Sequence, residues 1–187
     1  EVSIMQKMNT YVSLLRGINV AGQKKIKMEH LKRVYESKGF ENVITYIQSG
    51  NVVFKSALQQ DKISSSLEEA IKAEFGFEVP VIVRSLDEWI KICDKNPFIK
   101  NGELEEGNQY VAILNKVPEK SAIEHALAFD FINDSFSIEG REVYIWYASK
   151  FSDSKLDNKF LESKLKVVST MRNWNTMNKL KELALSL

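Results

Sequence analysis

Two apolar pentapeptides of nearly the same sequence begin two stretches of the chain that carry the same order of predicted elements. The first is YVSLL at 11–15 and the second is YVAIL at 110–114. Each is followed by a helix pattern, two strand patterns joined near a glycine (Gly50 and Gly140), a second helix pattern and a last strand pattern. Because repetition of element types marks a duplicated unit, we expect two copies of one fold.

The first stretch has the order βαββαβ. Its predicted strands are 11–16, 43–48, 51–55 and 79–84, and its predicted helices are 28–38 and 59–75. Only Ser49 and Gly50 separate the second and third strands, which predicts a two-residue hairpin loop. Apolar residues three and four apart predict the buried helix faces, which consist of Met28, Leu31, Val34 and Tyr35 and of Ile63, Leu67, Ala70, Ile71 and Phe75.

The second stretch repeats this order and adds a helix. Its predicted strands are 110–114, 135–139, 142–148 and 166–169, and its predicted helices are 119–129, 154–165 and 171–185. A connecting helix at 86–94 and a loop at 95–108 separate the two stretches. We predict an α+β fold, a tandem repeat of two ferredoxin-like βαββαβ units at 11–94 and 109–187, the second with an extra C-terminal helix.

The predicted strands are apolar on both faces. Runs such as 52–54 (VVF) and 144–147 (YIWY) do not alternate apolar with polar residues, as a sheet with one face in water would. We therefore expect both faces of each sheet to be covered and the two units to pack into one compact body.

Composition excludes several classes of protein. The 187 residues are 44% hydrophobic and 27% charged, which predicts a folded chain with 1–10 as the candidate for disorder. Because no apolar run reaches about 18 residues and no signal peptide is evident, we expect a cytoplasmic protein without a membrane segment. The single cysteine, Cys93, lies in an apolar helix pattern and is expected to be a buried, inert thiol. His30 and His125 lack neighbouring ligand residues, so we predict no metal and no cofactor.

Positive charge is concentrated at the two ends of the chain. Residues 11–55 hold eight Lys and Arg against three Asp and Glu, and residues 150–187 hold eight against four. Residues 56–149 hold nine against seventeen, so the net charge of +1 hides a strong asymmetry. The ends either meet in a basic region that attracts an anionic partner or form separate solvated faces.

The segment LLRGINVAGQKKIKM, at 14–28, has glycines spaced as in a phosphate-binding loop. Gly17 and Gly22 have the Gly-x-x-x-x-Gly spacing between a strand and a helix. Gln23 stands where that loop has its lysine, and no Ser or Thr follows to hold magnesium, so the pattern does not predict a nucleoside triphosphatase. Lys24, the loop and the helix start could hold another anion, or Gly17 supplies only the backbone angles of a surface loop.

Two further segments carry polar side chains that could face a ligand. In YIQSGNVVF, at 46–54, Gln48 and Asn51 bracket the turn and either cap its backbone or present amides to a ligand. In STMRNWNTMNKL, at 169–180, Trp174 falls on the predicted buried stripe of the last helix. Another face of that helix, either an anion site or a solvated surface, consists of Arg172, Thr176 and Lys179.

Taken together, these three segments and the NPF at 96–98 resemble the bacterial family known as domain of unknown function 1697, from about 11 to 183. The resemblance implies a tandem ferredoxin-like α+β fold and supplies no catalytic residue. The chain has Ala21-Gly22 where the family usually has Gly-Gly. The alanine argues against a model in which the backbone at that position must approach a ligand closely. It keeps the Thr-x-Arg-Asn-Trp pattern at 170–174.

Our leading hypothesis is a binding module for an anionic ligand: a nucleotide, a phosphorylated metabolite or a nucleic-acid backbone. The residues expected to converge on one patch are Arg16, Asn19, Lys24, Gln48, Ser49, Asn51, Arg172 and Asn173. The third strand, NVVFKS, lacks the exposed aromatic run of an RNA-recognition module, so a nucleic acid would lie in a groove that follows its phosphates.

Two other classes of function remain open. One is a small metal-independent enzyme acting on a phosphorylated or carboxylated metabolite, with Glu29, His30 and Tyr46 as candidate acids and bases. The other is a structural or protein-interaction module in which the polar motifs hold the repeats together. No standard catalytic motif is present in the sequence.

Overall fold

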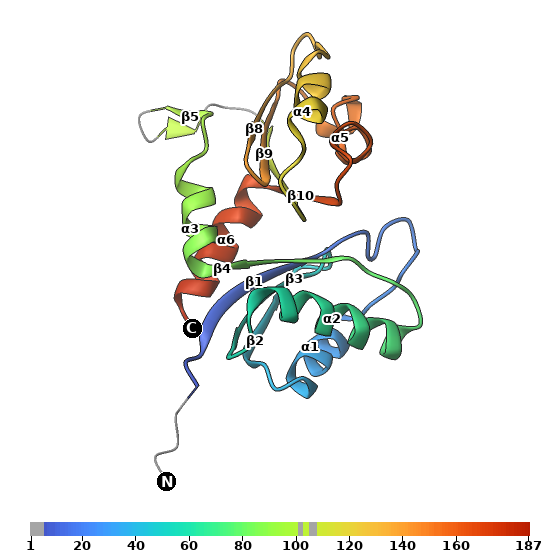
Figure 1. Cartoon of the computed structure of the whole chain (residues 1–187), viewed down its shortest axis with the longest axis vertical. Helices are drawn as coiled ribbons and strands as arrows, with labels where there is room; N and C mark the ends of the chain where they lie inside the picture. The colour runs from blue at the N-terminus through green and yellow to red at the C-terminus, as the bar shows by residue number, and fades with distance from the viewer. Residues whose placement is uncertain (1–5, 101–102, 105–107) are drawn as a thin grey trace. The chain divides into compact units, whose positions relative to one another are not determined.

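The computed structural model describes residues 6–100, 103–104 and 108–187, and the chain divides into two compact units. Unit 1 comprises Glu1–Lys91 and Lys179–Leu187, and unit 2 comprises Ile92–Asn178. The boundary falls within two helices, α3 (Leu86–Asp94) and α6 (Trp174–Leu185) (Figure 1). Residues 1–5 of the candidate disordered segment 1–10, and 101–102 and 105–107 of the predicted loop, lie outside the described residues. The prediction of disorder is wrong for residues 9 and 10, which belong to a strand.

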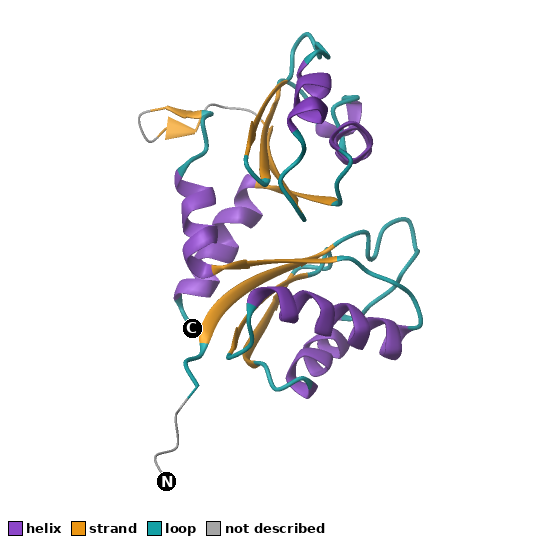
Figure 2. Ribbon diagram, viewed as in Figure 1, coloured by secondary structure: helices purple, strands orange, loops and turns teal. Residues whose placement is uncertain are grey.

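Unit 1 is a four-stranded antiparallel sheet with two helices on one of its faces (Figure 2). The strands have the order β2-β3-β1-β4. The elements, in chain order, are β1 (Asn9–Leu15), α1 (Met28–Ser37), β2 (Glu41–Tyr46), β3 (Asn51–Ser56), α2 (Gln60–Phe75) and β4 (Val81–Ser85).

Unit 2 has the same order of elements and the same sheet topology. Its strands have the order β10-β7-β9-β8, again antiparallel, so β7 takes the place in this sheet that β1 takes in unit 1. The elements are β7 (Asn108–Leu114), α4 (Lys120–Leu127), β8 (Ser135–Glu139), β9 (Glu142–Tyr147), a 3-10 turn (Phe151–Asp153), α5 (Asn158–Leu165) and β10 (Ser169–Asn173). The described residues therefore form a mixed α+β fold with two four-stranded sheets and six α-helices.

Each unit has its own apolar core between its sheet and its pair of helices. In unit 1 the helix residues at three- and four-residue spacing pack on the inner sheet face, as the sequence predicts; the fully buried ones are Leu31, Tyr35, Ile63, Leu67 and Ile71. In unit 2 the corresponding cluster contains Ala112, Leu114, Ala126, Val143, Ile145, Leu161 and Leu165. Burial of these side chains is the main favourable term in the folding free energy of each unit.

The central strands of each sheet are buried on both faces, as their composition predicts. The edge strands β2 and β8 are only partly buried. Leu15 belongs to the unit 1 core, whereas Leu14 points to the opposite face, and both are fully buried. In unit 2 the adjacent residues Ile113 and Leu114 are likewise fully buried on opposite faces.

The predicted two-residue hairpin loop is wrong. β2 ends at Tyr46, which pairs with Asn51 of β3, so four residues, 47–50, form the turn. Ile47 and Gly50 both have left-handed backbone angles, with φ of 50° and 84°. The glycine comes last in the turn because its backbone packs closely against β1: the Gly50 carbonyl accepts a hydrogen bond from the Leu15 N–H at 2.8 Å.

The last strand begins three residues later than predicted, which changes the environment of Arg172. The sequence pattern predicts a strand at 166–169, but β10 covers Ser169–Asn173 and pairs with β7, Arg172 lying opposite Val111. The helix α6 starts at Trp174 instead of 171. The prediction that Arg172 shares a helix face with Thr176 and Lys179 is therefore wrong, because Arg172 is a strand residue.

Two predicted boundaries in unit 2 also differ from the structure. The helix predicted at 154–165 begins only at Asn158, where the Asp157 side chain caps it by accepting the Phe160 N–H at 2.7 Å. The predicted loop 95–108 contains two short paired strands, β5 (Ile99–Lys100) and β6 (Glu103–Leu104).

Three buried tyrosines predict a loss of stability in alkaline solution. Burial raises the pKa values of Tyr35, Tyr144 and Tyr147 above the ordinary value of 10. Their hydroxyls hydrogen-bond to Ser13 Oγ and to the Ile92 and Leu156 carbonyls at 2.7, 2.7 and 2.5 Å. A group whose pKa is raised on folding stabilises the fold fully below its unfolded pKa and loses this effect as the pH rises.

We therefore expect the free energy of unfolding, measured by urea titration, to show no tyrosine-dependent fall below about pH 9 and to decline steadily above about pH 10. Tyr35→Phe should lower stability at pH 7, because Ser13 loses one of its two hydrogen-bond partners, and should make the alkaline decline shallower. A wild-type stability that stays constant up to about pH 11.5 would contradict this assignment.

Candidate functional site

The segment 16–27, between β1 and α1, is the most cationic connection in unit 1, and we call it the cationic loop. It holds four basic residues and no acidic residue: Arg16, Lys24, Lys25 and Lys27. Lys25 and Lys27 are exposed, whereas Arg16 and Lys24 are half-buried. The Arg16 N–H donates to the Pro80 carbonyl at 3.0 Å, which ties the start of the loop to the segment before β4.

The backbone of the cationic loop is held in an unusual conformation. Five of its residues have left-handed backbone angles, with φ between 46° and 74°: Gly17, Asn19, Ala21, Gly22 and Lys24. This conformation suits glycine and is tolerated by asparagine, but alanine and lysine adopt it at a cost of about 1–2 kcal/mol each. Hydrogen bonds from Asn19 N to the Lys24 carbonyl, at 3.1 Å, and from Gln23 N to the Val20 carbonyl, at 2.9 Å, close the loop.

Asn19 joins the cationic loop to the β2–β3 turn. Its Nδ2 donates to the carbonyls of Ile26, at 3.0 Å, and Gln48, at 2.7 Å. Its Oδ1 accepts the Ile26 N–H at 2.9 Å. The structure therefore brings two of the predicted site segments together, and it uses the Asn19 amide to do so.

The polar residues of the turn itself also make internal contacts. Asn51 is fully buried, and its Nδ2 donates to the Tyr46 carbonyl at 2.9 Å and to Ser49 Oγ at 2.8 Å. Of the two sequence interpretations for Asn51, capping of the turn is therefore the one supported by contacts. The Gln48 side chain, by contrast, is exposed at the tip of the turn.

Lys24 contacts the segment before β4. Its Nζ donates to the Glu78 carbonyl at 2.7 Å. The pKa of the exposed Glu78 carboxyl is lowered chiefly by the hydrogen bond and charge of Lys72 and to a smaller extent by the charge of Lys24. Lys24 thus helps to fix the loop, and the exposed charges of the loop are those of Lys25 and Lys27.

The predicted site omits four exposed residues of the cationic loop and the β2–β3 turn: Val20, Lys25, Lys27 and Ile47. The phosphate-loop spacing points to Lys24 rather than to Lys25 and Lys27, although the run of three lysines in four positions is visible in the sequence. Val20 and Ile47 are exposed by 62% and 48% and flank the Asn19–Gln48 hydrogen bond in sequence. Their exposure depends on the left-handed backbone around them, for which the sequence carries no clear signal.

The remaining predicted site residues, Arg172 and Asn173, belong to unit 2. The Arg172 guanidinium is buried and donates to Thr170 Oγ1 at 2.6 Å and to the Met171 carbonyl at 2.9 Å. Burial lowers its pKa to about 10, so it stays charged at neutral pH. Asn173 Oδ1 accepts the Thr176 N–H at 2.8 Å and caps α6. A joint patch of Arg172 with Arg16 stays a prediction.

His30, a candidate acid or base, and Cys93, the single thiol, each contact a neighbouring protein group. His30 Nε2 lies 2.6 Å from Glu74 Oε1 on the surface, and the buried Cys93 Sγ donates to the Met177 carbonyl at 3.8 Å. Over the described residues, no three His, Cys, Asp or Glu side chains gather as a metal site would require. In the same part of the chain, no helix combines the length and apolar character needed to cross a membrane.

Comparison with known proteins identifies a fold relative and a family. The solved structure of conserved bacterial protein SP0830 from Streptococcus pneumoniae is similar over 95% of this chain and 99% of that chain, with a TM-score of 0.74 and 21% sequence identity. This similarity concerns the fold. No curated protein matches the chain. The profile of a family described as "Protein of unknown function (DUF1697)" matches residues 8–144, more than half of the sequence. The chain therefore belongs to the DUF1697 family.

Proposed function

We propose that the protein is a binding module for an anionic ligand and that the cationic loop of unit 1 is its binding surface. The observation that carries the proposal is the combination of backbone strain and unneutralised charge in one short loop. Ala21 and Lys24 are held in a left-handed conformation, and Lys25 and Lys27 project from a loop with no acidic residue. Strained backbone of this kind is concentrated at ligand sites, where the rest of the fold maintains it.

The exposed side chains beside the lysines favour a ligand that also has an apolar part. Val20 and Ile47 present aliphatic surface, and Gln48 adds an amide with both a donor and an acceptor. A nucleotide unit, with phosphates for the lysines and a base for the aliphatic and amide groups, matches this set. We therefore propose a free nucleotide or single-stranded nucleic acid as the ligand.

We further propose that the two units are ferredoxin-like repeats of one ancestral βαββαβ unit. The identical order of elements and the identical strand order of the two sheets support this proposal. The similar pentapeptides lie in β1 and β7, which occupy equivalent places in their sheets.

The binding proposal is tested by titrating ATP and a labelled single-stranded RNA oligomer at low salt. We expect the double variant Lys25→Gln/Lys27→Gln to weaken RNA binding at least tenfold. If each lysine contacts one phosphate, the slope of log affinity against log salt should become shallower by about 1.4, since a single-strand contact contributes about 0.7.

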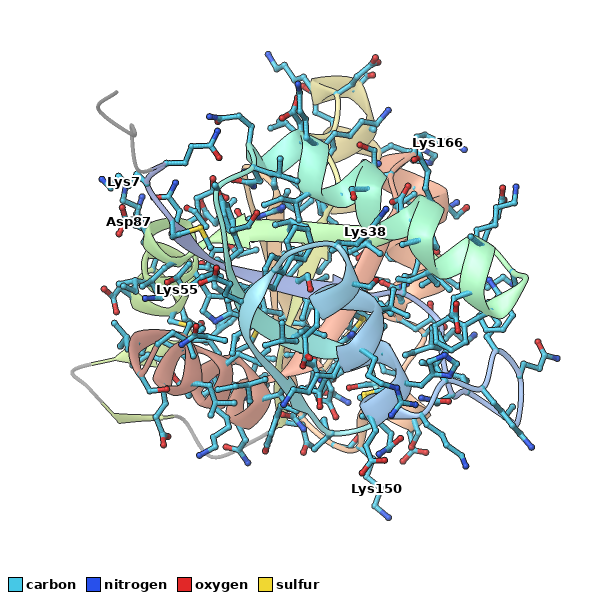
Figure 3. All side chains as sticks on the ribbon, turned by 90° about the horizontal axis from the view of Figure 1, so that it is seen from below. Lys7, Lys38, Lys55, Asp87, Lys150 and Lys166 are labelled. Carbon is cyan, nitrogen blue, oxygen red and sulfur yellow. The ribbon has the colours of Figure 1, made fainter. Side chains whose placement is uncertain are left out.

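The matched control is Lys38→Gln/Lys62→Gln, which removes two exposed lysines of unit 1 outside the cationic loop (Figure 3 labels Lys38). Its affinity should stay within twofold of the wild type. An equal loss in both double variants would mean that binding follows net charge alone and would overturn the proposal. So would the absence of binding to both probes at low salt.

A further inference from the structure

Basic side chains also gather in unit 2, on the helical side of its sheet. A recess of about 400 Å³ is lined by Lys116, Glu119, Ser121, Ala122, His125, Lys164, Leu165 and Lys166. These residues come from the connection between β7 and α4, from α4, from α5 and from the residue after α5. The volume is in the lower part of the range of small-molecule sites, which is about 300–1,000 Å³.

The three lysines of this recess are not neutralised by acidic side chains. In the portion of the chain that the structure describes, none of Lys116, Lys164 and Lys166 has a carboxylate within ion-pair distance. Other lysines on the same unit do have such a partner, for example Lys120 with Glu124 at 4.0 Å. Three lysines around a concave surface outnumber the one carboxylate of the lining, Glu119, so the local potential is positive and attracts an anion.

Local contacts fix the backbone of one of these lysines and the ammonium group of another. Lys166 ends α5 in a left-handed conformation, with φ of 56°, and its N–H donates to the Glu162 carbonyl at 3.0 Å (Figure 3 labels Lys166). Glycine or asparagine usually takes this position, so lysine at 166 goes against the local backbone preference. The Nζ of Lys164 lies 4.8 Å from the centroid of the Phe129 ring, whose face holds the ammonium without neutralising it.

The remaining lining residues indicate what else the ligand carries. Glu119 is the one carboxylate of the lining and can accept hydrogen bonds from hydroxyl groups, and Ser121 can donate or accept. Leu165 and Ala122 contribute apolar wall, and the lining as described contains one aromatic ring, that of His125, too few to enclose a base between two rings. The set favours a compact, hydroxylated anion over a nucleotide.

We propose that this recess binds a sugar phosphate or a similar phosphorylated polyol, with the phosphate at the lysines and a hydroxyl at Glu119. A phosphate dianion matches three ammonium groups better than a carboxylate does, because it carries more charge and three terminal acceptor oxygens. The site lies within unit 2 and shares no residue with the cationic loop, so it does not depend on the function proposed for unit 1.

The test is calorimetric titration of the full chain with ribose 5-phosphate, ribose and inorganic phosphate at equal ionic strength. We expect ribose 5-phosphate to bind at least tenfold more tightly than either of the other two. Lys164→Gln/Lys166→Asn should weaken it at least tenfold, and asparagine suits the left-handed backbone at 166. Lys155→Gln/Lys159→Gln, which removes two exposed lysines of unit 2 outside the recess, should leave the affinity within twofold.

Further variants distinguish binding in this recess from binding elsewhere on the chain. Should the Lys164/Lys166 variant not fold, Lys116→Gln, on an exposed connection, must weaken binding at least threefold. Glu119→Gln should lower the ratio of the affinity for ribose 5-phosphate to the affinity for inorganic phosphate. Absence of binding, an equal loss in the Lys155/Lys159 control, or a loss in Lys25→Gln/Lys27→Gln instead would overturn the proposal, and the last outcome would place the phosphate at the cationic loop.

Discussion

Gly50→Ala should destabilise the protein by about 2–5 kcal/mol, the largest loss that we expect from adding a single methyl group. Gly50 has φ of 84°, which alanine adopts with strain. A Cβ atom at this position would lie 2.7 Å from Leu15 Cβ and 2.8 Å from Ile18 Cδ1. Both neighbours are buried, so they cannot move aside without disturbing the core of unit 1. Urea unfolding of the purified variant measures the loss.

The matched control for this change is Gly76→Ala. Gly76 has nearly the same backbone angle, with φ of 82°, but a Cβ there would meet no atom within 4 Å. This variant should lose about 1–2 kcal/mol, the cost of the backbone conformation alone. Equal losses at positions 50 and 76 would show that the β2–β3 turn does not pack on β1 as described.

Asn19→Ala should cost about 2–4 kcal/mol of stability and should also weaken ligand binding at the cationic loop. The substitution removes three hydrogen bonds: two to the Ile26 backbone close the loop on itself, and one to the Gln48 carbonyl joins the loop to the β2–β3 turn. It also places alanine in a left-handed conformation, with φ of 55°. Because the lysines are presented by this loop, releasing it should lower affinity for ATP and RNA even where the protein stays folded.

The control Asn42→Ala separates the cost of the backbone conformation from the cost of the lost hydrogen bonds. Asn42 has φ of 52°, is exposed and, within the described residues, makes no side-chain hydrogen bond. It should show only the backbone cost of about 1–2 kcal/mol and no change in affinity. If Asn19→Ala loses no more stability than Asn42→Ala and binds normally, then Asn19 does not organise the loop.

The sequence predicts the elements well because their burial patterns are local. Helix α1 has its apolar residues at the predicted spacing, and the similar pentapeptides mark strands at equivalent places in the two sheets. The bounds of strand β10 escape prediction because its start depends on pairing with β7, far away in sequence. Lys166 ends α5 in a left-handed turn, and nothing in the letters KVVS indicates that pairing begins only at Ser169.

The candidate sites are harder to predict than the fold. Asn19, Asn51 and Asn173 are the kind of polar residue that binds ligands, yet each makes hydrogen bonds that shape the backbone around it. Only the three-dimensional structure shows whether an amide side chain faces a ligand or hydrogen-bonds to the backbone around it. The recess of unit 2 has no sequence signal, because Lys116 and Lys164 meet there through the packing of α4 and α5.

Amide chemical shifts during a titration of the ¹⁵N-labelled full chain with ATP show residue by residue whether the cationic loop is an anion-binding surface. We predict that the largest shift changes occur at residues 17–27 and 47–49, saturate with ATP, and vanish in Lys25→Gln/Lys27→Gln while persisting in Lys38→Gln/Lys62→Gln. Saturating shifts confined to other parts of the chain, or no shifts at millimolar ATP and low salt, would show that the cationic loop is not the binding surface.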